Sequence, residues 1–180
     1  RIREIMRVGI FFFFFHYPSE GARDIRRLDD EMIAQAAAAD ALGFDSYWVA
    51  EHHFHEYGVV PNPALFLTAI AQRTRHIKLG CAVAVLPFAN PIRVAEDYAM
   101  LDIVPGGRLK MGLGSGYLAH EFACFGIPFD EKRERFDEGL DVLWRAWTGL
   151  PFSHDGKYWR LQDVRLNVVP LQQPSPRLWI

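Results

Sequence analysis

An acid and two adjacent histidines follow an apolar run near residue 50, and these side chains could carry out proton chemistry. Glu51, His52 and His53 come directly after the run 48–50. Imidazole changes its charge near neutral pH and is the most frequent general acid or base in enzymes. Ionisable groups at the end of a buried strand are costly unless a ligand or a proton uses them. The sequence therefore predicts a catalytic site here, with His52 and Glu51 as its candidate residues.

Side chains alternate along a strand, so Glu51 and His53 are predicted to share one direction while His52 points in the other. A core histidine that bonds to the backbone is the alternative for either imidazole. A metal site is a second alternative, because His53 and His55 have a spacing that can hold a divalent ion, with Glu51 or Asp45 nearby. No second ligand cluster stands out in the sequence, so no metal ligand is predicted.

A glycine-rich segment forms a second candidate site. The apolar run 109–113 continues into Gly114, Ser115 and Gly116. Glycines let backbone N–H groups approach a phosphate or a planar ring closely, and Ser115 adds a hydroxyl. A tight turn between a strand and a helix is the alternative. Within a third apolar run, 77–85, the small side chains of Ala82 and Val83 leave room beside a ring.

Short apolar runs alternate with amphipathic helices along the chain. Predicted strands occupy 7–14, 46–50, 77–85, 109–113 and 177–180, and predicted helices occupy 24–42, 63–73, 90–101 and 131–147. Residues 152–169 carry a hairpin signal at Asp155-Gly156 and are predicted to be an antiparallel excursion. This strict alternation favours an α/β fold with a parallel sheet. Four β/α units and a fifth strand would make the N-terminal half of a TIM (β/α)8 barrel. Active sites of such barrels lie at the C-terminal ends of the strands.

A doubly wound open sheet is the alternative architecture. It should carry a Gly-x-Gly-x-x-Gly segment after the first strand, and the residues that follow Phe14 do not supply one. The start at Arg1 and the stop at Ile180 inside a predicted strand indicate a fragment of a longer protein. An isolated half barrel is expected to expose strand edges and to aggregate or dimerise.

The composition indicates an ordinary globular domain over residues 1–180. Half of the 180 residues are hydrophobic, and the net charge of −2 gives no footprint for nucleic acid or an anionic membrane. Arg1, Arg3 and Arg7 before the apolar run 8–15 resemble a signal peptide. The apolar run has only eight residues and no cleavage site follows it, so it is predicted to be a buried strand. The two cysteines, Cys81 and Cys124, indicate a reduced, cytoplasmic protein in which both thiols pack in the core.

Taken together, the motifs resemble the bacterial-luciferase-like, flavin-dependent monooxygenases. They cover nearly the whole chain in the family's order. The matching pieces are Gly43-Phe44-Asp45, Ala50-Glu51-His52-His53-Phe54, Val60-x-Asn62-Pro63, Val85-Leu86-Pro87, Asn90-Pro91-x-Arg93-x-x-Glu96-Asp97, Gly107-Arg108, Gly112-x-Gly114-Ser115-Gly116-Tyr117 and Glu121-Phe122-x-x-Phe125-Gly126. The resemblance implies a luciferase-like (β/α)8 barrel, of which this chain is the N-terminal half.

The resemblance also implies an activity. Reduced FMN from a separate flavin reductase would react with O2 to a C4a-hydroperoxide, and a small organic substrate such as an aldehyde would be oxygenated. Proton management falls to His52 beside the acid Glu51. The implied cofactor contacts are a non-proline cis peptide between Ala82 and Val83, followed by Gly114, Ser115 and Gly116. A homodimer is implied, and the pocket roof is expected to include Phe12, Phe14 and Phe54.

Two departures from the family pattern leave alternatives open. Luciferase itself has a reactive cysteine where this chain has Gly114. Many relatives have an arginine, aimed at the flavin phosphate, where Ser115 stands, and further phosphate ligands would lie beyond residue 180. An F420-dependent oxidoreductase on the same fold is therefore the first alternative. A flavin-binding relative without catalysis is the second, and a metal hydrolase is the third.

Overall fold

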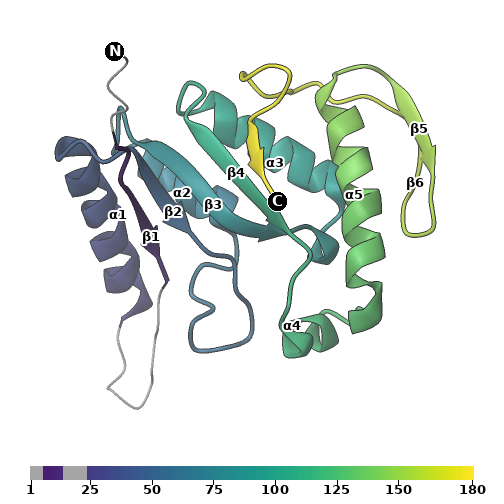
Figure 1. The fold of residues 1–180 in the computed structure, drawn as a ribbon, viewed down its shortest axis with the longest axis horizontal. Helices are drawn as coiled ribbons and strands as arrows, with labels where there is room; N and C mark the ends of the chain where they lie inside the picture. The colour runs from purple at the N-terminus through teal and green to yellow at the C-terminus, as the bar shows by residue number, and fades with distance from the viewer. Residues whose placement is uncertain (1–5, 14–23) are drawn as a thin grey trace.

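The computed structural model describes residues 6–13 and 24–180, and a five-stranded parallel sheet is its central element (Figure 1). The strands lie side by side in the order β1-β2-β3-β4-β7, which is their order along the chain. A strand order that follows the chain is that of a (β/α)8 barrel and not of a doubly wound sheet. The strands are β1 (Gly9–Phe12), β2 (Ser46–Val49), β3 (Lys78–Val85), β4 (Leu109–Gly114) and β7 (Arg177–Trp179).

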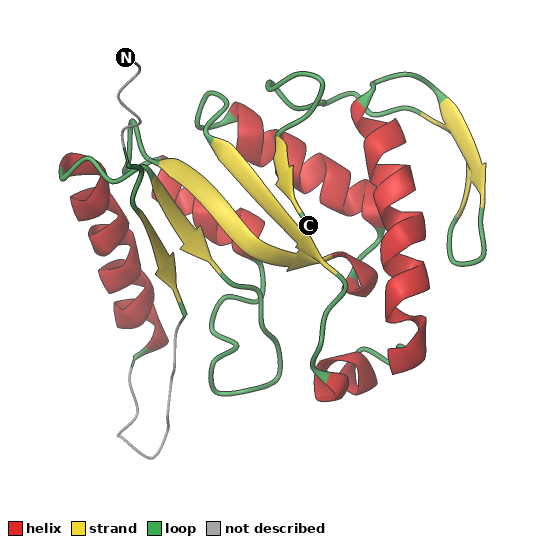
Figure 2. Cartoon of the chain, viewed as in Figure 1, coloured by secondary structure: helices red, strands yellow, loops and turns green. Residues whose placement is uncertain are grey.

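Helices connect the strands and cover one face of the sheet (Figure 2). They are α1 (Ile25–Ala41), α2 (Pro63–Ala71), α3 (Pro91–Ile103), α4 (Ala119–Cys124) and α5 (Lys132–Trp147), with short 3-10 turns η2 (Leu86–Phe88) and η3 (Phe129–Glu131). Three of them begin at a side-chain cap, since Asp24, Asn62 and Asn90 each accept a backbone N–H of the first turn. These caps explain why the predicted helix starts lie within a residue of the observed ones.

The hydrophobic core lies between the sheet and its helices, on what we call the outer face. Fully buried side chains of the strands, such as Tyr47, Leu79 and Met111, meet buried residues of the helices there. The opposite, inner face is open in this half barrel. The prediction that β1 is covered on both faces is therefore wrong, and the strand is half-buried. Phe12 stacks on Tyr47 in the outer layer, whereas Phe11 on the inner face is 55% exposed.

The cysteine prediction holds for one thiol and fails for the other. Cys81 is fully buried on β3, and burial raises the pKa of its thiol well above the usual value. Cys124 is exposed, because the short helix α4 buries only Glu121 and Phe122. Helix α4 itself was not among the predicted elements, since six residues are too few to show a helical period.

A two-stranded antiparallel sheet, β5 (Phe152–Asp155) with β6 (Arg160–Val164), stands apart from the main sheet and beside α5 (Figure 1). A single carboxylate on α5 fastens its turn. Glu138 accepts the backbone N–H groups of residues 157, 158 and 159, and His154 lies 3.1 Å from its Oε1. These bonds to N–H groups and to His154 hold the pKa of Glu138 below its usual value, against the effect of burial. Among residues 6–13 and 24–180, no helix is long and apolar enough to cross a membrane.

An ion cluster closes the N-terminal end of the inner face. The carboxylate of Asp45 accepts from Lys110 Nζ at 2.7 Å and from Lys78 Nζ at 3.1 Å. The hydrogen bond from Lys110, followed by that from Lys78, lowers the pKa of Asp45 to about 2, although burial opposes the shift. The cluster joins the start of β2 to β3 and β4, and so holds three strands in register.

We predict that the 180-residue chain expressed alone associates with itself. Strands β1 and β7 are both open edges of the sheet, and the inner face exposes apolar side chains such as Phe11 and Trp179. Sedimentation velocity should show dimers or larger species across the micromolar range. A monomer with a sharp, reversible unfolding transition would contradict this prediction.

We also predict acid sensitivity from Asp45. A carboxyl group whose pKa falls from 3.8 to about 2 on folding stabilises the fold above pH 4, and this contribution is lost as the pH falls from about 4 towards 2. Asp45→Asn should lower the free energy of unfolding at pH 7 and flatten its pH dependence in that window. Asp155→Asn, at a highly exposed carboxylate, is the matched control and should change neither quantity. Equal acid profiles for wild type and Asp45→Asn would refute the assignment.

Candidate active site

The C-terminal ends of β2, β3 and β4 surround one cavity of about 480 Å³, which we call the trough. All seven residues that the sequence put forward as site residues line it, and Figure 1 shows why: neighbouring parallel strands end at the same edge of the sheet. The lining residues are Phe11, Phe13, Ala50, Glu51, His52, Ala82, Val83, Val85, Gly114, Ser115, Gly116, Tyr117 and Glu121.

A buried histidine–carboxylate pair forms the polar end of the trough. His52 follows β2 and is 7% exposed, and its Nδ1 lies 3.2 Å from Oε1 of Glu121, which is 2% exposed. The same oxygen accepts the backbone N–H of His53 at 2.8 Å. A carboxylate that holds one ring nitrogen fixes the orientation of the imidazole. Because the bond uses Nδ1, Nε2 is the nitrogen that can exchange a proton with a molecule in the trough.

Sequence reasoning had given Glu121 no role. It appeared only within the motif that begins Glu121-Phe122. Its partner lies 69 residues earlier in the chain, and no local spacing connects the two positions. The available signal was a carboxylate followed by the apolar residues Phe122 and Ala123, which suggests an acid on the buried side of a short helix.

Glu51 has a different partner from His52. Its Oε1 lies 2.9 Å from Nε2 of His53, and its Oε2 accepts the backbone N–H of Val85 at 3.0 Å. Glu51 and His53 therefore share one direction and His52 takes the other, as strand alternation predicted. The bond to Val85 ties the end of β2 to the end of β3, so Glu51 positions the wall of the trough that it also lines.

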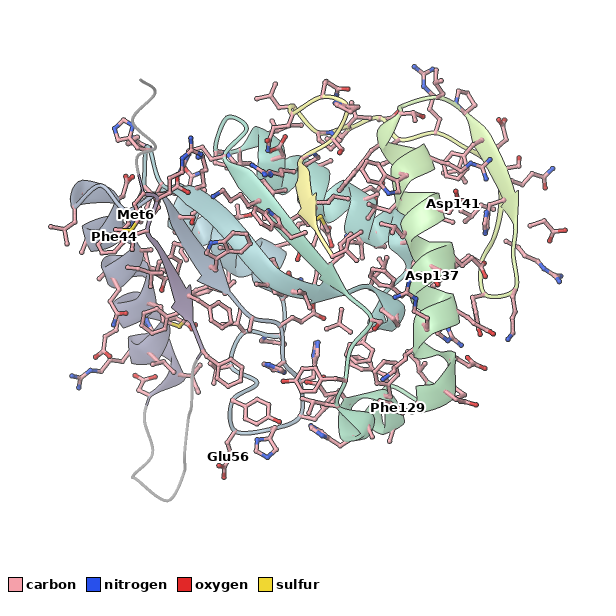
Figure 3. All side chains as sticks on the ribbon, viewed as in Figure 1. Met6, Phe44, Glu56, Phe129, Asp137 and Asp141 are labelled. Atoms are coloured by element: carbon pink, nitrogen blue, oxygen red, sulfur yellow. The ribbon has the colours of Figure 1, made fainter. Side chains whose placement is uncertain are left out.

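The metal alternative finds no support in the described part of the chain. His53 pairs with Glu51, and the ring of His55 stacks on Tyr57 with centroids 4.1 Å apart. Within residues 6–13 and 24–180, no three His, Cys, Asp or Glu side chains are grouped so as to hold a metal ion. Glu56 follows His55 at the tip of this loop and points away from the sheet (Figure 3).

The middle of β3 forms the floor of the trough. The peptide bond between Ala82 and Val83 is cis, and the pairing of β3 with β4 shifts register between Cys81 and Ala84. As a result, two consecutive residues, Ala82 and Val83, both line the trough. The resemblance had implied a cis peptide at this position.

The glycines of β4 make room for this floor. A Cβ at Gly114 would lie 2.5 Å from a methyl carbon of Val83, and a Cβ at Gly112 would lie 2.5 Å from the carbonyl oxygen of Cys81. Gly116 has a φ of +77° and packs against Phe122 of α4. The glycine-rich segment thus makes room for its own neighbours, Val83 and Phe122.

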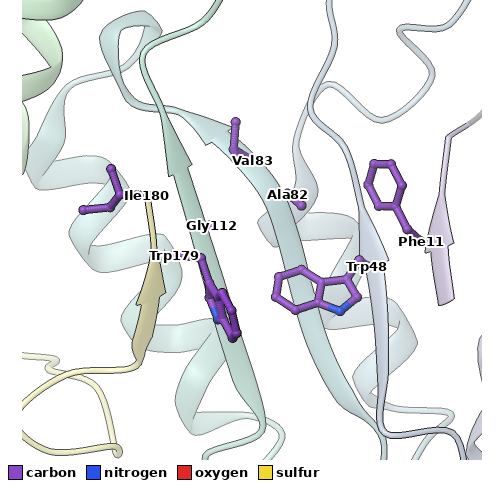
Figure 4. A pocket seen from close by; sticks show the side chains of 7 residues that line it. All are labelled: Phe11, Trp48, Ala82, Val83, Gly112, Trp179 and Ile180. Atoms are coloured by element: carbon purple, nitrogen blue, oxygen red, sulfur yellow. The ribbon is translucent and has the colours of Figure 1, made fainter. Parts of the chain in front are cut away.

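A second, apolar cavity of about 460 Å³ continues from the trough along the inner face (Figure 4). Both cavities are lined by Phe11, Ala82 and Val83. Its indole rings come from Trp48 and Trp179, whose centroids are 6.1 Å apart. The ring of Trp48 lies directly over Gly80, where any Cβ would collide with it, and its Nε1 donates to Ser46 Oγ at 3.0 Å.

Aromatic rings surround His52. Phe13 and Tyr57 each contact its ring edge-on with centroids 5.0 Å away, and Tyr117 does so at 6.2 Å. Burial, followed by the proximity of Tyr117 and Glu121, raises the pKa of Tyr57. These rings limit the access of water to the imidazole.

The expected roof residues are partly wrong. Phe12 lies on the outer face against Tyr47, because alternation along β1 gives the trough Phe11 and Phe13 instead. Phe54 is 56% exposed and contacts His53 and Phe125 outside the trough. Phe14 lies outside the described residues.

The chain is similar in sequence to known proteins. The model of the luciferase-like monooxygenase family matches residues 6–180. The oxygenase component of a flavin-dependent trigonelline monooxygenase from Acinetobacter baylyi is 33% identical over 86% of this chain and 43% of its own length. An F420-dependent glucose-6-phosphate dehydrogenase from Amycolatopsis mediterranei is 31% identical over 81% of this chain and 46% of its own length.

Solved structures show the same fold. The monooxygenase RslO1 from Streptomyces bottropensis superposes with a TM-score of 0.91 at 37% identity, over 96% of this chain and 52% of that one. The oxygenating constituent of 3,6-diketocamphane monooxygenase from Pseudomonas putida, in complex with FMN, superposes with a TM-score of 0.88 at 27% identity. This match covers 96% of this chain and 50% of that one. The chain spans about half the length of the curated relatives it matches. The half barrel inferred from the sequence is thus confirmed as part of a luciferase-like barrel.

We predict that Glu121→Ala lowers the free energy of unfolding of the complete protein by about 1–3 kcal/mol, because two buried donors lose their acceptor. Glu121→Gln keeps an acceptor oxygen and should lose less. Glu31→Ala, at an exposed ion pair of α1, is the control and should stay within about 0.5 kcal/mol of wild type. Urea denaturation measures all three, and equal effects of Glu121→Ala and Glu31→Ala would contradict the pairing.

Proposed function

The chain belongs to the luciferase-like monooxygenase family, and we propose that it is the N-terminal half of a flavin-dependent monooxygenase. The complete enzyme would use reduced FMN and O2 to oxygenate a small organic substrate of the aldehyde type. One observation carries the proposal: the buried His52–Glu121 pair opens on the same trough as the small side chains of Ala82 and Val83 and the bare backbone of Gly114.

The trough suits a planar ring. Its floor consists of the backbone and small side chains of Ala82 and Val83, and Gly114 adds no side chain beside them. The Ser115 hydroxyl and the backbone of Gly116 line the end where β4 stops, and these groups would contact the polar tail of the flavin. Reduced FMN, when bound, would supply the electrons that activate O2.

Each polar residue of the trough then has a task of its own. His52 would take up or deliver a proton at Nε2, and Glu121 would keep the ring in place through Nδ1. Glu51 would hold the wall by its bonds to His53 and to the backbone N–H of Val85. The rings that surround His52 would exclude water, which protects reactive intermediates from side reactions.

The proposal includes partners. A relative described as an oxygenase component supports a separate flavin reductase that supplies reduced FMN to this protein. We further propose a homodimer, and a single domain in which residues 1–180 continue into the rest of the barrel. An F420-dependent oxidoreductase is the second candidate, because Ser115 replaces an expected arginine and an F420-dependent relative is 31% identical.

We predict that the complete protein consumes O2 when reduced FMN and an aldehyde are supplied. His52→Ala should lower the rate of substrate oxygenation by about 10²–10⁴-fold, the usual contribution of a general acid or base. His76→Ala, at an exposed histidine on the N-terminal side of β3, is the matched control and should keep the wild-type rate.

The outcomes separate the candidate functions. Binding of reduced F420 with hydride transfer and no O2 uptake would replace the monooxygenase by the F420-dependent enzyme. Tight flavin binding with no turnover, unchanged in His52→Ala, would instead indicate a flavin-binding protein without catalysis.

A further inference from the structure

The N-terminal end of the inner face carries an excess of cations. Trp48, Gly80, Lys110 and Arg177 are register neighbours on β2, β3, β4 and β7. Register neighbours in a parallel sheet point to the same face, and Trp48 lines the inner-face cavity. Lys110 and Arg177 therefore face inward. Lys78, two residues before Gly80 on β3, faces inward as well.

Two of these cations, Lys78 and Lys110, share the carboxylate of Asp45, and within the described part of the chain Arg177 makes no ion pair. Asp45 binds Lys110 at 2.7 Å and Lys78 at 3.1 Å, and Nε of Arg7 also lies 4.0 Å from it. The guanidinium of Arg177 lies 5.0 Å from the ring centroid of Trp179. Lys110 Nζ lies 5.7 Å from the ring centroid of Trp48. The faces of these two indole rings attract the cations, but the rings carry no net charge and do not neutralise them.

Closing the barrel would make this excess costly. The interior of a (β/α)8 barrel is a packed core, and a buried cation without a partner is strongly destabilising. The Lys110 side chain is only 15% exposed even in the open half barrel, so further strands would bury it completely. The cations must then either gain acidic partners or reach solvent through the N-terminal end of the barrel.

We propose that the remaining strands of the barrel dock on this face through at least two carboxylates near their N-terminal ends. These Asp or Glu residues would pair with Lys78, Lys110 and Arg177. Three observations favour this occupant: the charge excess itself, the open edges at β1 and β7, and the length of the relatives, about twice that of this chain. The inference rests on the barrel of the proposed function but not on its flavin chemistry.

The test is the crystal structure of the complete protein. We expect carboxylate oxygens from residues beyond position 180 within 4 Å of Lys78 Nζ, Lys110 Nζ or the Arg177 guanidinium. A closed barrel whose cations contact only Asp45 and solvent would overturn the inference, and so would a chain that does not close. Either result is independent of O2 uptake, so failure here is distinguishable from failure of the proposed function.

A charge exchange supplies the energetic test. Lys110→Glu in the complete protein should lower Tm, and changing its newly identified acidic partner to Lys in the same chain should restore at least half of the loss. Lys157→Glu, at an exposed lysine of the β5–β6 turn, is the control, and the same partner change should not rescue it. No rescue of Lys110→Glu would overturn the pairing.

Discussion

The bond between Glu121 and His52 is the interaction on which the site depends. A carboxylate that is 2% exposed must be partnered, and this one is held by His52 Nδ1 and the backbone N–H of His53. The pair fastens the short helix α4 to the loop after β2. That contact places Tyr117 and Gly116 opposite His52 and thereby forms one wall of the trough. Phe122 of the same helix is fully buried against Phe88 and Phe129, so an apolar contact holds α4 beside this polar one.

The two faces of the sheet meet different physical demands. The outer face is covered by helices and uses large apolar side chains, which bury the most surface. On the inner face glycines stand beside bulkier side chains, since the indole of Trp48 needs the space that Gly80 leaves and Val83 needs the space that Gly114 leaves. The register shift in β3 interrupts this alternation at one place only, and there both Ala82 and Val83 reach the trough.

Three carboxylates link segments that the regular secondary structure leaves unconnected. Glu51 joins the end of β2 to the end of β3, Glu138 fastens the turn of the β5–β6 hairpin to α5, and Asp45 gathers lysines from two strands. Glu51 and Glu138 accept backbone N–H groups at a strand end and at a turn, whereas Asp45 accepts from lysine side chains. The link made by Glu51 lies beside the trough, whereas the Asp45 cluster lies at the opposite, N-terminal end of the sheet and Glu138 fixes the hairpin.

The sequence by itself determined the order of strands and helices. Apolar periodicity and cap residues such as Asp24, Asn62 and Asn90 are local signals, so helix starts could be predicted within a residue. It also placed Glu51, His52 and the segment Gly114–Gly116 at strand ends, and parallel strands bring such ends together.

Only the tertiary structure decided which side chains pair. The partner of His52 lies 69 residues away, and Cys124 faces solvent because α4 is short. Phe12, expected in the pocket roof, lies on the outer face, and Phe11 and Phe13 line the trough in its place. These outcomes depend on distances between segments that are far apart in the chain, and no local pattern encodes such distances.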